Sequence, residues 1–329
     1  MRAIRYERFG GYDVLELVDV AVPQASEDAV VVRMTVAGVN PLDETVRSGK
    51  LAPHLHKPLP IRPGGFGVGV IEDAGGTSWE VGTRVAISGG RYGVSTDGTW
   101  ADYVAVHPRH LVRVPDAVTD EGAAALTTGT GYLTAYLALT RLAGFEAGRT
   151  VLAPGIGGAV GQGGVEVARV LGAARAISTA TDTARAEHGR AAGYDVIDLS
   201  QESLSEGVAR LTDGAGVDVV LDGVGGPVTG QALKALATDG SLISIGYAGG
   251  RQATVDVTDL IWKNAHVHGF RFALFTDDDV NSGNDFLLGL LAQGKVRPSV
   301  ARTFPLEEAA AAQRHLAEER PFGRVLLAL

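Results

Sequence analysis

The segment VLAPGIGGAVGQGGVEVARV, residues 151–170, decides how the second half of the chain folds. It starts with a short apolar run, passes through a glycine-rich turn and continues as an amphipathic helix. Gly155, Gly158 and Gly161 recur at three-residue intervals in the turn. Such glycines let a strand turn tightly into a helix, where a diphosphate can approach the backbone N–H groups. The alternative is a flexible glycine-rich joint, and the flanking sequence distinguishes the two.

The sequence beyond this turn alternates between short β-rich runs and helical patterns. Strands are expected at 150–153, 174–179, 195–198, 217–222, 241–246 and 265–270, with helices between them. Alternation at this spacing predicts βαβ units and one doubly wound parallel sheet. A glycine turn that opens such a series is typical of a Rossmann domain, which binds a dinucleotide.

The two ends of the chain show a different pattern of predicted secondary structure. Short strands punctuated by glycine and proline are expected within residues 1–120, at 30–40, 68–75, 82–87 and 100–107, around a proline-rich loop at 51–65. Beyond residue 270 the pattern indicates two helices and a last strand at 323–329. The sequence therefore predicts an α/β protein with a β-rich domain and a parallel-sheet domain.

Composition excludes several classes of function. The formal net charge of the 329 residues is −9, which argues against nonspecific binding to nucleic acid or to an anionic membrane. The absence of cysteine excludes disulfides, thiolate catalysis and cysteine-ligated zinc. The charged N-terminal segment predicts no signal peptide, and no apolar run is long enough to span a membrane, so a cytoplasmic location is expected.

The end of the second Rossmann strand indicates which dinucleotide binds. NAD-binding domains usually place an acidic residue there, whereas this strand ends in small neutral residues up to Thr181. Arg185, one helical turn further on, can face a 2′-phosphate, so the expected cofactor is NADPH. The alternatives are that Arg185 is only a solvated helix residue and that Asp182 reaches the ribose rather than capping the helix.

Several motifs together resemble one known family. They are AGVNPLD (37–43), VRSG (46–49), LTAYLAL (133–139), PGIGGAVG (154–161), GVDVVLDGVGG (216–226) and SLISIG (241–246). The ensemble resembles the zinc-independent quinone oxidoreductase (zeta-crystallin-like) branch of the medium-chain dehydrogenase/reductase superfamily. The resemblance implies a GroES-like β-barrel catalytic domain of residues 1–120 plus 270–329, and a Rossmann NADPH-binding domain of residues 121–269.

The resemblance also implies a set of cofactor contacts. The pyrophosphate is expected at Gly157, Gly158, Ala159 and Val160, and the adenosine side at Thr181 and Arg185. Further contacts follow later strands, at Gly225, Gly226, Ile245, Gly246, Tyr247, Phe270, Arg271 and Phe272. Asp222 is expected to serve as a turn partner. Thr130, between two glycines of a helix break, is a nicotinamide or substrate contact or a core residue.

No metal site is expected. Zinc-dependent members of the superfamily use Cys, His and acidic ligands, and GGFGVGV (64–70) carries neither the His nor the Glu of that pattern. The pair His54 and His56 is expected to be merely exposed. Without a metal, the favoured reaction is hydride transfer from NADPH to a quinone or an α,β-unsaturated carbonyl compound, because hydride addition there gives a delocalised enolate.

Three residues are candidates for the catalytic step. Asn40, in the Asn-x-x-Asp motif with Asp43, donates to the substrate oxygen or the nicotinamide, or only holds a turn. Relatives often carry a tyrosine proton donor after the Arg-Ser-Gly sequence, where this chain has Lys50 and Leu51. Lys50, Tyr92 or water then protonates the enolate, and water is the first choice.

The sequence gives less support to other functions. A short-chain dehydrogenase needs Tyr-x-x-x-Lys, which no tyrosine here provides, and a methyltransferase has no use for the barrel. A non-catalytic NADPH-binding structural protein, an RNA-binding relative or a biosynthetic enoyl reductase stays open, although the acidic charge disfavours RNA. The segment AHVHGF (265–270) forms the expected sheet edge, through which the family pairs as a homodimer.

Overall fold

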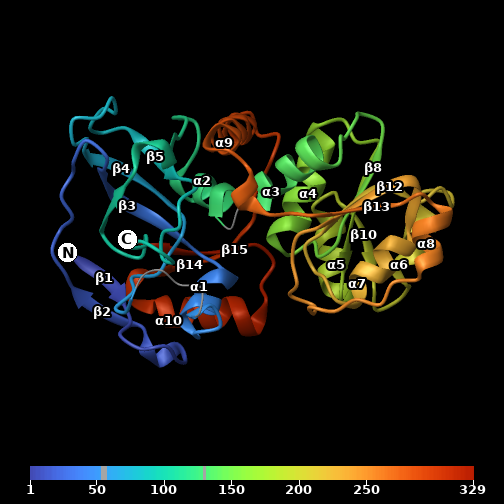
Figure 1. Cartoon of the computed structure of the whole chain (residues 1–329), viewed down its shortest axis with the longest axis horizontal. Helices are drawn as coiled ribbons and strands as arrows, with labels where there is room; N and C mark the ends of the chain where they lie inside the picture. The colour runs from blue at the N-terminus through green and yellow to red at the C-terminus, as the bar shows by residue number, and fades with distance from the viewer. Residues whose placement is uncertain (53–57, 129–130) are drawn as a thin grey trace. The chain divides into compact units, whose positions relative to one another are not determined.

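The computed structural model describes residues 1–52, 58–128 and 131–329, and its contacts divide the chain into two compact units (Figure 1). The first unit contains Met1–Thr130 and Asp277–Leu329, and the second contains Gly131–Thr276. Both termini therefore belong to the first unit.

The first unit is built on β-strands. They are β1 (Arg2–Arg5), β2 (Glu16–Asp19), β3 (Val30–Val39), β4 (Gly67–Asp73), β5 (Arg84–Ile87), β6 (Tyr103–Val106), β7 (Leu111–Arg113), β14 (Val300–Pro305) and β15 (Arg324–Ala328). The main sheet has the order β14-β15-β3-β4-β5-β7, and β6 also pairs with β3. The β14–β15 pair is parallel and the others are antiparallel, so the C-terminal strand joins the sheet of the N-terminal region.

The helices of the first unit are α1 (Pro41–Arg47), α2 (Asp120–Thr127), α9 (Asp277–Ala292) and α10 (Ala309–Arg314). Several apolar clusters fill this unit, and two of them show how it is built. One surrounds Val32, Ile71 and Val104, and the other surrounds Trp100, Phe304 and Leu327. The second cluster holds residues from both ends of the chain in one core, which explains why the C-terminal segment belongs to this unit.

The second unit is a parallel sheet with helices around it (Figure 1). Its strands are β8 (Thr150–Ala153), β9 (Arg175–Ala180), β10 (Asp195–Asp198), β11 (Val217–Asp222), β12 (Leu236–Ser244) and β13 (His266–Gly269). Its helices are α3 (Gly131–Leu137), α4 (Ala159–Val170), α5 (Thr183–Ala191), α6 (Leu204–Leu211), α7 (Pro227–Lys234) and α8 (Val257–Trp262). The strand order β10-β9-β8-β11-β12-β13 is that of a Rossmann fold, as the sequence predicted.

Both unit boundaries differ from those predicted. The first lies after residue 130 rather than 120, because α2 packs on β3 and β4. The second lies after residue 276 rather than 269, and the backbone N–H of Phe270 donates to the carbonyl oxygen of Ser244 at 2.8 Å. Residues that follow β13 therefore stay attached to the parallel sheet. None of the helices in the described residues combines the length and apolar character needed to cross a bilayer.

Candidate cofactor and substrate site

The turn between β8 and α4 brings backbone to the carboxyl edge of the parallel sheet. Gly155 follows β8 in a left-handed conformation with φ of +86°. A Cβ atom on Gly161 would lie 1.9 Å from the carbonyl oxygen of Gly155, so glycine is required where the helix begins this close to the turn. A Cβ atom on Gly164 would lie 2.5 Å from the Cβ atom of Ala153 in β8. The glycine spacing thus fixes how closely α4 packs on its strand.

The first turn of α4 leaves backbone donors unused. Gly158 is the N-cap residue, and its carbonyl oxygen accepts the N–H of Gln162 at 3.0 Å. The described part of the chain offers no hydrogen-bond acceptor to the N–H groups of Ala159, Val160 and Gly161. Free N–H groups at the positive end of a helix form an anion site. The predicted pyrophosphate contacts lie in this turn.

The end of β9 carries the residues predicted to lie at the adenosine side. Asp182 caps α5 by accepting the backbone N–H of Arg185 at 2.9 Å. The Arg185 guanidinium lies against the same carboxylate, with Nη1 2.8 Å from Oδ2. These bonds, the backbone N–H first, hold the pKa of Asp182 below its usual value. Asp182 is therefore a helix cap, and exposed Thr181 and partly exposed Arg185 flank it.

The predicted contacts after β11 lie in a turn that Asp222 organises. Its fully buried carboxylate accepts the N–H of Gly225 at 2.8 Å and the hydroxyl of Thr229 at 2.5 Å. Gly225 and Gly226 both have positive φ. A Cβ atom on Gly226 would lie 2.5 Å from the carbonyl oxygen of Gly249. Close packing against the loop after β12 therefore explains both glycines without a ligand.

The last predicted contacts follow β12 and β13. Residues 245–247 come directly after β12, and residues 270–272 come directly after β13. The N–H groups of Ile245 and Gly246 share the carbonyl oxygen of Asp222, and Tyr247 is 60% exposed. All the described cofactor candidates thus follow the carboxyl ends of parallel strands, where ligands of this fold bind. The candidate Thr130 lies outside the described residues, as do His54 and His56.

Asn40 lies between β3 and α1, and the nitrogen of its side-chain amide is unpaired among the described residues. Its backbone N–H donates to Asp43 Oδ2 at 2.8 Å, and its carbonyl oxygen accepts the Asp43 N–H at 3.0 Å. Asn40 is 7% exposed, and its Nδ2 atom has no hydrogen-bond partner among the described residues. A buried, unpaired donor costs about 1–3 kcal/mol. The carboxylate of Asp43 holds the turn, so the amide of Asn40 is left for another acceptor.

The other two catalytic candidates are engaged elsewhere. Tyr92 is 6% exposed; its hydroxyl accepts the backbone N–H of His107 at 3.0 Å and lies 2.9 Å from His110 Nδ1. Burial raises the pKa of Tyr92, so its phenol is a poor source of protons. Lys50 follows α1 on the surface, where its Nζ atom lies 3.3 Å from Glu44. The structure therefore argues against Tyr92 as the donor and gives Lys50 an ordinary surface role.

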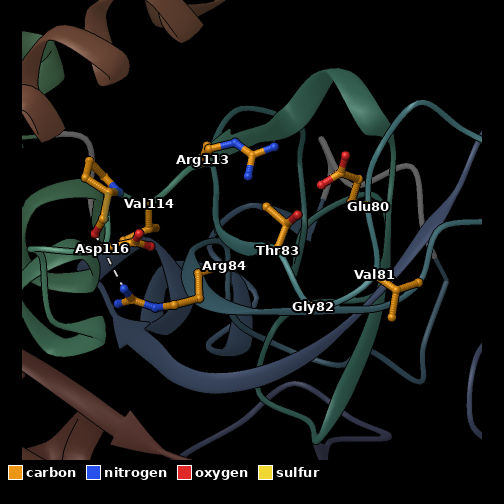
Figure 2. Close-up of a pocket in the computed structure, with 9 residues that line it drawn as sticks. Glu80, Val81, Gly82, Thr83, Arg84, Arg113, Val114 and Asp116 are labelled. Carbon is orange, nitrogen blue, oxygen red and sulfur yellow. Dashed lines mark hydrogen bonds between the residues drawn. The ribbon is translucent and has the colours of Figure 1, made fainter.

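Two surface hollows are lined by none of the predicted site residues. One is lined by residues 80–84, which lead into β5, and by residues 113–116 at and after the end of β7, and Figure 2 shows Glu80, Thr83 and Arg113 around it. Arg84 reaches from its rim toward the carbonyl oxygen of Pro115 and pairs with Asp120 at 2.5 Å. The other hollow lies between α7 and α8. Neither contains a polar atom that is buried and unpaired, so neither has the character of a built binding site.

Metal ligands do not gather in the described residues. Within 1–52, 58–128 and 131–329, no three His, Asp or Glu side chains lie close enough together to hold an ion. Two buried polar atoms of the first unit were not among the predicted site residues, although they have no partner in the described part of the chain: Tyr6 Oη and Arg62 Nε. Arg62 lies in the proline-rich segment before β4, whereas nothing in the charged sequence around Tyr6 marks it as buried.

Family models match most of the chain. The alcohol dehydrogenase GroES-like domain matches residues 26–116, and the zinc-binding dehydrogenase domain matches residues 192–327. The quinone oxidoreductase of Pseudomonas aeruginosa is 31% identical over 335 residues, which cover 99% of each chain. The chain belongs to the quinone oxidoreductase branch of the medium-chain dehydrogenase/reductase superfamily. This branch combines the GroES-like and Rossmann domains, as the motifs predicted.

Further proteins are similar to the chain over nearly its whole length. The human quinone oxidoreductase is 26% identical over 322 residues, which cover 96% of this chain and 94% of that one. The structure of a mycobacterial relative complexed with NADPH has a TM-score of 0.85 and 28% identity, with complete coverage of both chains. An NAD-dependent alcohol dehydrogenase has a TM-score of 0.87 and 30% identity, also with complete coverage. The protein is accordingly an oxidoreductase of the nicotinamide-dependent kind.

Proposed function

We propose that the protein is an NADPH-dependent reductase that transfers hydride to a quinone or an α,β-unsaturated carbonyl compound without a metal ion. The observation that carries the proposal is the set of unused N–H groups in the first turn of α4, at the carboxyl edge of a Rossmann sheet. The quinone oxidoreductase relatives and the NADPH complex of a neighbour support it.

The residues present fit a dinucleotide phosphate. The backbone of Ala159, Val160 and Gly161 would hold the diphosphate, because these donors lack other acceptors in the described residues. Arg185 would bind the 2′-phosphate, and exposed Thr181 adds a neutral hydroxyl beside it. The carboxylate of Asp182 already accepts hydrogen bonds from the backbone N–H and the guanidinium of Arg185. It is therefore less available to bind the ribose hydroxyl groups. When bound, NADPH supplies the hydride.

The side chains of the first unit suit a conjugated acceptor. Asn40 Nδ2 would donate to the acceptor oxygen, where negative charge develops as the enolate forms. A saturated carbonyl needs a stronger electrophile, and the chain has no cysteine to hold a catalytic zinc in the manner of the alcohol dehydrogenases. Because Tyr92 is engaged and Lys50 is paired, water is the proposed proton source.

An acceptor panel tests the proposal. Purified protein is mixed with NADPH and with quinones, enals, enones and saturated ketones in separate reactions, and NADPH consumption is followed. We expect turnover with one or more conjugated acceptors, none with the saturated ketones, and no loss of rate after chelation. Turnover of a saturated ketone that a chelator abolishes would contradict the metal-free mechanism, and inertness toward the whole panel would contradict the reductase.

We also propose that two copies of the chain associate through the edge strand β13. In the described sheet β13 pairs only with β12, and Val267 is 52% exposed. Ile261 and Trp262 of the neighbouring α8 are 70% and 80% exposed. The strand at the opposite edge, β10, is mostly buried. An uncovered edge with apolar side chains favours pairing with a second copy.

Sedimentation of the purified protein tests this association. We expect a mass twice that of one chain, and a shift toward the single chain when Ile261 and Trp262 are both replaced by Ser. A wild-type protein that sediments as a single chain at micromolar concentration would overturn the proposed dimer.

A further inference from the structure

Asp43 is a buried carboxyl group that the proposed mechanism has not yet used. It is 7% exposed, and it accepts the backbone N–H of Asn40 at 2.8 Å and that of Gly64. Gly64 belongs to the segment between α1 and β4, so the carboxyl group joins two loops of the first unit. No cation pairs with it in the part of the chain that the structure describes.

The environment of this carboxyl group disfavours its charge. Tyr6 faces it with a hydroxyl that is buried and has no hydrogen-bond partner among the described residues. Arg47 acts on Tyr6 but donates its own hydrogen bonds to Gln313 Oε1 at 2.7 Å and to the carbonyl oxygen of Gly10. Burial therefore raises the pKa of Asp43 to about 7, against the opposing effect of its two N–H donors.

The side chains of Asn40 and Asp43 form a capping box at the start of α1. The side chain of the N-cap residue Asn40 faces the backbone N–H of Asp43, and the carboxylate of Asp43 accepts the backbone N–H of Asn40 at 2.8 Å. The Nδ2 atom of Asn40 takes no part in this box and has no hydrogen-bond partner among the described residues.

We infer that Asp43 is a positioning residue for hydride transfer, whose carboxylate fixes the backbone of Asn40 and so aims Nδ2 at the oxygen of the acceptor. The inference rests on the proposed function. A carboxylate accepts hydrogen bonds at both oxygens, whereas a protonated carboxyl group carries a hydrogen on one of them. Protonation therefore weakens the hold on Asn40 or Gly64, and the active geometry belongs to the ionised form.

The pH dependence of kcat/KM tests this role. For the wild type, kcat/KM should rise with pH through about 7. In Asp43→Asn this rise on the acid side of the pH profile, the acid limb, should disappear. The value of kcat/KM at pH 8 should fall by about tenfold to a hundredfold, which is the loss expected for a hydrogen bond to a charged group. KM for NADPH should not change. An acid limb that persists in Asp43→Asn would overturn the inference.

Glu206→Gln is the matched control. Glu206 accepts the backbone N–H of Ser203 at 2.9 Å at the start of α6, which is the same bond on an exposed helix of the second unit. This variant should keep the wild-type pH profile. If Glu206→Gln flattens the acid limb as well, the effect is one of general stability and the inference fails.

A double-mutant cycle with Asn40→Ala shows whether Asp43 acts through Asn40. Asp43→Asn should change kcat/KM by less than about twofold in the Asn40→Ala background, because the group that it positions is gone. Equal effects in both backgrounds would contradict the inference.

Nuclear magnetic resonance separates the inference from the proposed function. The backbone amide resonance of Asn40 should titrate through about 7 in the wild type and stay constant in Asp43→Asn, with no substrate present. If no acceptor turns over while this titration is seen, the proposed function fails but the coupling of Asp43 to Asn40 stands. An Asn40 resonance that does not move with pH would overturn the coupling itself.

Discussion

At the scale of single residues, hydrogen-bond partners decide which candidates are available for chemistry. Asn40 and Tyr92 are about equally buried, but only the amide of Asn40 lacks a partner in the described residues. The Tyr92 hydroxyl meets His107 and His110, which are distant in the sequence, so no local pattern predicts that it is engaged. The Asn-x-x-Asp spacing was visible in the sequence, whereas the burial of Asp43 and the unpaired Nδ2 atom of Asn40 were not.

Replacement of Arg185 should separate the two nicotinamide cofactors. Arg185→Ala should weaken NADPH binding by about tenfold to a hundredfold, because a charge-assisted contact to a 2′-phosphate contributes about 1.5–3 kcal/mol. NADH binding should be unaffected, since NADH has no such phosphate. Calorimetric titration with each cofactor measures both affinities.

Arg149→Ala is the matched control for that comparison. Arg149 is an ion-paired arginine just before β8, at the other end of the sheet, and its loss should change neither affinity. Equal losses of NADPH and NADH affinity in Arg185→Ala would refute the 2′-phosphate contact.

Burial of Asp43 should also make the stability of the protein depend on pH. The pKa of Asp43 is about 7 in the folded state and 3.8 for the free group. Between pH 4 and pH 7 the folded state therefore holds a proton on Asp43 that the unfolded state has lost. The free energy of unfolding should therefore fall as pH rises from 4 to 7, by up to about 1.4 kcal/mol per pH unit from this group. Asp43→Asn should lose this contribution and become more stable than the wild type near pH 8. Urea unfolding across this pH range measures the difference, and parallel curves for the two proteins would contradict it.

At the scale of secondary structure, strands bounded by clear turn residues were predicted well. The predicted ranges 150–153, 195–198 and 217–222 coincide with β8, β10 and β11. The strand predicted at 241–246 begins earlier, at Leu236, because the Thr-Asp-Gly sequence that reads as a turn lies inside β12, with Asp239 at positive φ. The register of β12 against β11 shifts there, from Val217–Leu236 to Val219–Ser241, so the turn residues interrupt the pairing without ending the strand.

Helix starts were harder to predict than strands. The apolar pattern of DFLLGLLAQ indicates a helix near residue 285, whereas α9 begins at Asp277. The additional turns are polar, and three aspartates in the first turn favour the helix through its dipole rather than through burial. Hydrophobic periodicity carries no information about such a segment.

The close approach of α4 to the preceding turn should matter for both cofactor binding and stability. Gly161→Ala should weaken NADPH binding at least tenfold and lower stability, because its Cβ atom would lie 1.9 Å from the carbonyl oxygen of Gly155 and the turn must move. Thermal unfolding and calorimetric titration measure the two effects.

Gly289→Ala in α9 is the control for the glycine effect. Nothing lies within 4 Å of its added Cβ atom, so it should stabilise the protein by about 0.5–1 kcal/mol and leave cofactor binding unchanged. NADPH affinity that survives Gly161→Ala would show that the geometry of this turn does not matter for the cofactor.

At the scale of the whole molecule, each unit carries its own set of candidate residues. The second unit offers a row of backbone sites at one edge of a parallel sheet, which follows from strand order and was predictable from the alternation of strands and helices. The first unit offers Asn40, whose partner Asp43 also accepts the backbone N–H of Gly64 and is buried by the fold. The sequence therefore predicts the parallel-sheet fold of the second unit better than it predicts the contacts around Asn40 in the first.

The most direct test of the central claim is an NMR titration of the isotope-labelled protein with NADPH. The account predicts large shifts of the backbone amide resonances of Ala159, Val160 and Gly161, since these N–H groups would gain the diphosphate as their acceptor. The amide of Gly289 in α9 should not move. If NADPH leaves the three α4 resonances unchanged at saturating concentration, the assignment of this turn as the cofactor site is wrong.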